Sequence, residues 1–143
     1  MPQELATPQE AEDAFYDAID ERDAEALRGV WDDSADIACL LPMQPMLHGA
    51  DVHEAFRPLL DGEVTLDIQV RHLRWLEAGD IAIHFVEERV SAPGAPPQPA
   101  VYAINIFRKG SSGWRLLIHQ NSPTPPPPGA VFPPGMPPAQ IPS

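Results

Sequence analysis

The sequence predicts an α+β fold in which three N-terminal helices pack on a curved, mostly antiparallel sheet. Apolar residues recur at helical spacing through most of the first 60 residues and alternate with period two from about residue 64 to residue 122. Short turns join most of the later segments, which is typical of antiparallel strands. A chain of 143 residues suits a single hydrophobic core.

The first helix is predicted to begin at Pro8. Thr7 suits the N-cap position, proline is favoured at the first helical position, and Glu10 completes a capping box. One helical face then carries apolar residues at i, i+3, i+4, i+7 and i+8. These residues are Ala11, Ala14, Phe15, Ala18 and Ile19.

Two further helices and one strand are expected before the main sheet. Asp23 suits the cap of a short second helix, and residues 36–41 read as a first strand. A third helix is predicted near residue 50, where Asp51 and Glu54 have the spacing of another capping box. Pro58 is expected to bend that helix.

Four strands are predicted to start at Val64, Ile81, Val101 and Gly113. The period-two pattern slips at residues 72–75, which predicts a β-bulge. Both alternating sets of the strand that starts at Val101 are largely apolar, although three helices cover only one sheet face. We therefore expect a homodimer through the convex face of the sheet.

Charge and composition exclude several classes of partner. The net charge of −12 argues against nucleic acid and anionic membranes, because both require clustered Lys and Arg. The sequence contains no apolar run of membrane-spanning length and no signal-peptide pattern, and its single cysteine, Cys39, favours a reducing compartment. We expect a cytoplasmic protein, and no motif indicates a cofactor.

Several segments together resemble the NTF2-like superfamily, in particular the SnoaL-like and DUF4440 group related to ketosteroid isomerases. The segments are Ala14-Phe15-Tyr16-Asp17-Ala18-Ile19-Asp20-Glu21-Arg22-Asp23, Val30-Trp31-Asp32-Asp33-Ser34-Ala35-Asp36, His48-Gly49, Gly113-Trp114-Arg115-Leu116 and Ser122-Pro123. The resemblance implies a cystatin-like cone of helices and curved sheet, a pocket inside the cone, and frequent dimers. We expect residues 1–122 to form this domain and residues 123–143, which hold ten of the 19 prolines, to form a Pro-rich C-terminal arm.

The ketosteroid isomerase machinery does not carry over by position. That reaction uses a helical tyrosine, a protonated aspartic acid and an aspartate base. The corresponding positions here hold Phe15, Asn105 and Cys39. In the DUF4440 group a histidine often stands where this chain has Gln120, whereas Ser122 fits that group's pattern.

The resemblance also suggests which strand residues point into the cone. Ile81, Ile83, Phe85 and Glu87 are expected to point inward, which makes Glu87 the candidate catalytic base. The alternative is that Glu87 lies at the rim or pairs with Arg71 or Arg89. On the last strand, the inward set is expected to run from Trp114 through Gln120 to Ser122.

Seven further residues are candidates for ligand binding: Tyr16, Cys39, His48, Trp75, Asn105, Gln120 and Ser122. Cys39 is alternatively a buried inert thiol, His48 a loop-stabilising residue, and Asn105 and Gln120 partners of one another. His84 and His119 are expected on the convex face. The five histidines have no H-E-x-x-H or H-x-H spacing, so no metal site is predicted.

Two functions remain open from the sequence. The first is binding of a small, mainly apolar ligand, or isomerase-like or cyclase-like acid–base chemistry on it, in the pocket of the cone. The second is a non-catalytic dimeric interaction module whose pocket is filled by its own side chains or by the arm. The same architecture hosts both kinds of protein.

Overall fold

Two of the three predicted helices form as expected in the computed structural model, which describes residues 4–42, 44–62, 67–96 and 99–122. Helix α1 spans Pro8–Asp20, and its capping box between Thr7 and Glu10 is complete. Helix α2 spans Ala24–Val30, and the Asp23 carboxylate accepts a hydrogen bond from the Ala26 N–H. The proposed Pro-rich arm, residues 123–143, lies outside the described residues.

The third predicted helix is split in two, which corrects the sequence prediction. A 3-10 helix, η1, spans Gly49–Glu54, and a short α-helix, α3, spans Arg57–Asp61. The residue that precedes η1 is His48, so Asp51 does not cap it. Glu54 pairs instead with Arg57, and a new helical segment starts around Pro58, because proline is tolerated only in a first turn.

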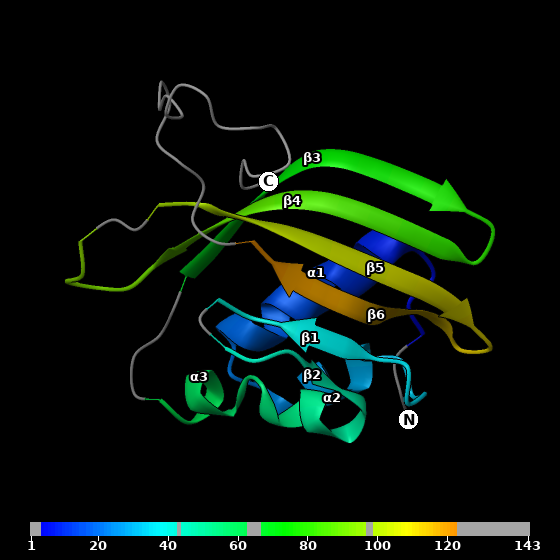
Figure 1. Cartoon of the computed structure of the whole chain (residues 1–143), viewed down its shortest axis with the longest axis horizontal. Helices are drawn as coiled ribbons and strands as arrows, with labels where there is room; N and C mark the ends of the chain where they lie inside the picture. Colours follow the sequence, from blue (N-terminus) through cyan, green and yellow to red (C-terminus); the bar gives the residue numbers. More distant parts are fainter. Residues whose placement is uncertain (1–3, 43, 63–66, 97–98, 123–143) are drawn as a thin grey trace, which may run out of the picture.

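Six strands form one mixed sheet in the order β2-β1-β6-β5-β4-β3 (Figure 1). The pairing of β1 with β6 is parallel and the other pairings are antiparallel. The α+β class is therefore confirmed. The strands are β1 (Ala38–Leu40), β2 (Leu47–His48), β3 (Asp67–Ala78), β4 (Ile81–Ser91), β5 (Val101–Gly110) and β6 (Gly113–Asn121).

Two β-bulges decide which side chains face the helices. The bulge predicted in β3 is present between His72 and Arg74. A second bulge lies in β6: Ile106 of β5 pairs with Ile118, whereas the next residue, Phe107, pairs with Leu116. Leu117 is therefore the extra residue of β6, and beyond it the two sets of β6 side chains exchange faces.

Helix α1 covers one face of the sheet, called here the inner face (Figure 1). The core lies between α1 and this face, where the Phe15 ring meets Trp31 and Phe56 edge to face at centroid distances of 6.1 and 5.6 Å. Phe107 and Leu116 of the sheet are fully buried beneath the helices. The opposite, outer face is half-exposed.

The inward set of β4 is shifted by one residue from the prediction. Ala82, His84, Val86 and Glu88 are buried, whereas the set that contains Glu87 is only half-buried. Both sets begin with apolar residues, so the period-two pattern alone could not assign the faces. The structure places two ionisable residues, His84 and Glu88, inside the cone.

No helix within the described ranges is long and apolar enough to cross a membrane.

Candidate functional site

A cavity of about 380 Å³ opens at the end of the cone, between α1, the segment that follows β1, the η1–α3 region and the inner face of the sheet. Most of its lining is apolar, with Phe15, Ile19 and Phe56 among the lining residues. Its polar lining is concentrated on the sheet and on α1. The polar residues are Tyr16, Glu88, His119 and Asn121, together with the exposed Gln44.

Glu88 is the buried carboxylate of this cavity, with 6% of its surface exposed. The Tyr16 hydroxyl donates a hydrogen bond to its Oε2 at 2.6 Å, and the Asn121 amide donates to its Oε1 at 2.8 Å. Burial and the adjacent Glu88 charge raise the pKa of Tyr16 well above its usual range. The phenol therefore stays protonated and acts as a hydrogen-bond donor.

His119 lies beside this carboxylate and is held on both sides. Its Nε2 is 3.8 Å from Glu88 Oε2 and 3.1 Å from the Asn121 Oδ1, and its Nδ1 is 2.6 Å from the Asn105 Oδ1. Both amide oxygens are acceptors, so each ring nitrogen of His119 faces a hydrogen-bond acceptor.

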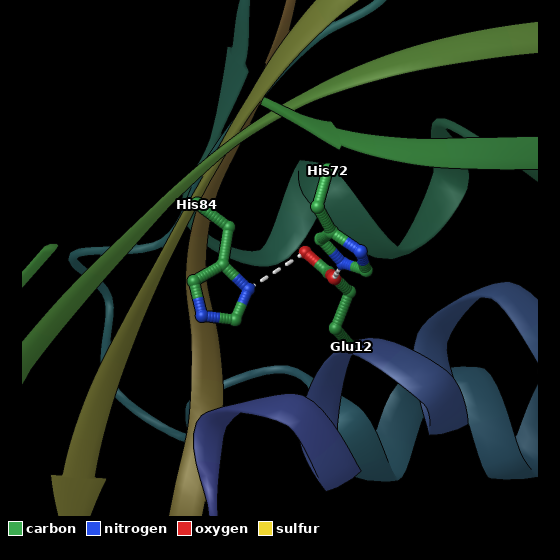
Figure 2. A group of neighbouring side chains, drawn as sticks. All are labelled: Glu12, His72 and His84. Atoms are coloured by element: carbon green, nitrogen blue, oxygen red, sulfur yellow. Dashed lines mark hydrogen bonds and ion pairs between the residues drawn. The ribbon is translucent and has the colours of Figure 1, made fainter. Parts of the chain in front are cut away.

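Asn105 connects the cavity to a second group of ionisable residues. Its amide donates to the Tyr16 hydroxyl at 3.0 Å and to Glu12 Oε2 at 3.1 Å. Glu12, on α1, also accepts hydrogen bonds from His84 Nδ1 at 3.0 Å and from His72 Nε2 (Figure 2). Burial raises the pKa of Glu12, but these hydrogen bonds outweigh it and leave the pKa lowered, so the carboxylate is ionised.

The sequence of this chain matches the model of the SnoaL-like domain family over residues 9–126. The chain belongs to the SnoaL-like domain family. This result confirms the resemblance inferred from the helix and strand motifs. No protein of curated function matches the chain.

Solved structures similar to this SnoaL-like domain carry different functional names. A structure from Thiobacillus denitrificans named as a calcium/calmodulin-dependent protein kinase type II association domain is 31% identical, with a TM-score of 0.78, and the match covers 86% of this chain and 98% of the other. A structure from Streptomyces avermitilis named as a dehydratase of the NTF2-like family is 27% identical over 79% and 90% of the two chains, with a TM-score of 0.71. A ketosteroid isomerase-like protein from Erwinia carotovora is 20% identical over 85% and 97%, with a TM-score of 0.67, and supports the fold alone.

The SnoaL-like domain places three of the predicted site residues on its outer face, which corrects the sequence analysis. Glu87 pairs with Arg71 there, as the alternative interpretation held, and Arg89 lies 3.9 Å from its other oxygen. Gln120 and Ser122 line a separate hollow of about 520 Å³ on the outer side. The bulge at Leu117 explains why Gln120 and Ser122 of β6 face outward, because it turns His119, rather than Gln120, toward the helices.

The remaining predicted residues divide between the inner face and the surface. Tyr16 and Asn105 meet in the buried hydrogen-bond network, as described above. Cys39 is buried on β1, where burial and the Glu88 charge raise the pKa of its thiol to about 12, in agreement with the alternative of an inert thiol. His48 is exposed, and Trp75, 49% exposed, stacks on His84; neither belongs to the cavity lining formed by the described residues.

Sequence reasoning missed the ionisable residues that the fold gathers on the inner face. An inward Glu87 implies that Glu88 faces away from the cone, and the sequence analysis expects His84 and His119 on the convex face. The sequence indicates the inward set of β4 only weakly. His84 and Glu88 alternate with the apolar Ala82 and Val86, and the opposite set of β4 likewise mixes apolar and charged residues. Glu12 belonged to an acidic run that is otherwise typical of a solvated helix face.

Proposed function

We propose that this SnoaL-like domain binds a small, mainly apolar ligand with a carbonyl or hydroxyl group and transfers a proton on it. The observation that carries the proposal is the Glu88 carboxylate, which is buried in a cavity of about 380 Å³ beside His119. Ligand cavities in proteins are typically apolar clefts of about 300–1,000 Å³ with a few convergent polar groups. The cavity has both properties.

The three polar groups suit different parts of an acid–base reaction. Glu88 would accept a proton from a carbon beside the ligand's carbonyl group, since its carboxylate has fixed donors that hold its orientation. His119 would donate a proton to the oxygen on which charge develops, or to a departing hydroxyl group. Tyr16 would remain protonated throughout and orient the carboxylate. Isomerisation and dehydration both begin with this proton abstraction.

The similar Streptomyces avermitilis structure named as a dehydratase supports this class of reaction. The mutual position of base and acid supports it further, because Glu88 and His119 approach within 3.8 Å and both line the same apolar cavity.

Deuterium exchange tests the proposal without knowledge of the natural substrate. A panel of small cyclic ketones in D2O is followed by proton NMR for loss of the hydrogens next to the carbonyl. We expect Glu88→Gln to slow the exchange by about 100-fold or more, because a positioned general base contributes about 10²–10⁴-fold. The matched control is Glu87→Gln, one residue away on the outer face, which should exchange like the unmodified protein. No catalysed exchange, or equal rates in both variants, would count against Glu88.

We also propose that two copies associate through the outer face of the sheet. Tyr102 is 47% exposed and Ile104 is half-exposed on this face, together with Leu73 and Leu76 on β3. Exposed apolar patches of this kind mark interaction sites.

A non-catalytic interaction module is the second candidate function. Its support is the 31% identical structure from Thiobacillus denitrificans that is named as an association domain. Light scattering measures the oligomeric state of the unmodified chain and of Ile104→Asp. A dimer that becomes a monomer on substitution supports the outer-face contact. A monomeric unmodified protein contradicts it. An intact dimer without catalysed exchange would favour the interaction module.

A further inference from the structure

We propose that Glu12, His72 and His84 form a binding site for a divalent transition-metal ion, with Zn²⁺ as the ion best suited to its ligands. This inference is independent of the proposed acid–base function, because none of the three residues belongs to the described lining of the Glu88 cavity. One carboxylate oxygen and two imidazole nitrogens make a ligand set that divalent zinc, iron and cobalt accept.

Three different elements bring these ligands together. Glu12 points from α1 toward the sheet, and its carboxylate lies between the rings of His72 on β3 and His84 on β4 (Figure 2). One ligand atom from each residue lies within 4.8 Å of the other two. His72 and His84 lie 60 and 72 positions after Glu12 in the sequence, so only the fold assembles the site.

The ligand atoms lie near the spacing of a metal site. Metal–ligand bonds of about 2.0–2.1 Å in a tetrahedral site place the ligand atoms about 3.3 Å apart. His84 Nδ1 lies 3.0 Å from Glu12 Oε2, and His72 Nε2 contacts Glu12 Oε1. An ion would be bound by the ring nitrogens that now contact the carboxylate, and each neutral imidazole would carry its single proton on its other nitrogen.

The surroundings favour a cation and hold the ligands in place. Glu12 is 1% exposed and ionised, and within the described part of the chain its carboxylate accepts hydrogen bonds from His72, His84 and Asn105. Asn105 donates to Glu12 Oε2 and fixes the carboxylate, which is the role of a group that supports a metal ligand from behind. The Trp75 indole stacks on the His84 ring at 4.6 Å and meets the His72 ring at 4.8 Å, so it restrains both rings.

An entry route also exists. The His72 side chain is 36% exposed, whereas those of Glu12 and His84 are nearly fully buried. An ion would therefore reach the group from the His72 side. Three protein ligands leave at least one coordination position for water or another small ligand on that side.

Isothermal titration calorimetry with Zn²⁺ tests the proposal on the 143-residue chain, prepared without a histidine tag and treated with a chelator. We expect saturation at one ion per chain. His72→Gln should weaken binding by at least about 10-fold, and Glu12→Gln should do the same, since even groups behind a metal ligand affect affinity by about 10–100-fold. The matched control is His48→Ala, which removes an exposed histidine elsewhere and should bind Zn²⁺ normally.

Two further measurements keep the test decisive. Circular dichroism establishes that each variant is folded, and His72→Gln is the safer variant because its side chain is partly exposed. The Co²⁺ adduct should give the visible absorption of nitrogen and oxygen ligands, which His72→Gln should abolish. A thiolate-to-cobalt band would place the ion on Cys39 and overturn the proposal. Unchanged Zn²⁺ affinity in both folded variants, or no saturable uptake by the unmodified chain, would overturn it as well.

Discussion

The hydrogen bond between Tyr16 and Glu88 gives the sharpest quantitative prediction. The phenol donates to the buried carboxylate at 2.6 Å, and a hydrogen bond to a charged group contributes about 1.5–3 kcal/mol to stability. Tyr16→Phe removes this donor. The Asn105 amide, which also donates to the phenol oxygen, keeps Glu12 as an acceptor. We therefore expect the substitution to lower the free energy of unfolding by about 2 kcal/mol.

A double-mutant cycle isolates the contribution of this pair. Urea unfolding at pH 7 is measured for the unmodified chain, Tyr16→Phe, Glu88→Gln and the double variant. We expect a coupling energy of about 1.5–3 kcal/mol, since the two groups contact each other directly. Tyr102→Phe is the control, because Tyr102 lies on the outer face and should change stability by less than about 0.5 kcal/mol. A coupling energy below about 0.5 kcal/mol would refute the role assigned to Tyr16.

Three other predictions concern the fold around the site. Burial raises the pKa of Asp32, but hydrogen bonds, above all from Arg108, outweigh it and leave the pKa below the usual 3.8. Asp32→Asn should therefore lower the free energy of unfolding above about pH 5, and the difference in stability between the variant and the unmodified chain should shrink below pH 3.8 when acid unfolding is measured. Gly113 has φ +104° and its missing Cβ would overlap the backbone of Leu5, so Gly113→Ala should lower the free energy of unfolding by about 3 kcal/mol or more in urea; a loss under about 1 kcal/mol would contradict that contact. The Cys39 thiol, 2% exposed with a pKa raised to about 12, should resist Ellman's reagent at pH 8 in the native protein and react fully in urea; rapid native reaction would show that the site opens.

Local sequence signals predicted the elements well where one residue type has a clear structural role. The Thr7–Glu10 capping box, the cap at Asp23, and the bulge after His72 all appear as expected. The turn between β3 and β4 follows the same rule, because Gly79 supplies the positive φ that it requires. These features depend on neighbours within a few positions, which the sequence displays directly.

The assignment of faces could not be predicted in the same way. Both alternating sets of β4 contain apolar and ionisable residues, and the bulge at Leu117 of β6 has no local sequence mark. A shift of one residue exchanges every side chain between the faces of a strand. The structure therefore makes Glu88, rather than Glu87, the candidate base. The inward histidine of β6 is His119, one residue before Gln120, the position at which the family resemblance expects a histidine.

The ionisable group at Glu12 illustrates a further limit. Its partners His72 and His84 come from two strands distant in the sequence, and their spacing matches no local metal motif. In the sequence, Glu12 belongs to a run of acidic residues that lies outside the apolar face of the first helix. Only the packing of α1 on the sheet brings one carboxylate against two imidazoles.

The most direct test of the central claim is to locate a bound probe by NMR. Cyclohexanone is titrated into isotopically labelled protein, and shifts are compared between the inner cavity and the outer face. Saturable shifts at His119, Phe15 and Tyr16, with Ile104 unchanged, are the predicted result and would place the ligand beside Glu88. Shifts confined to the outer face, or none at all, would contradict the assignment of this cavity as the ligand site.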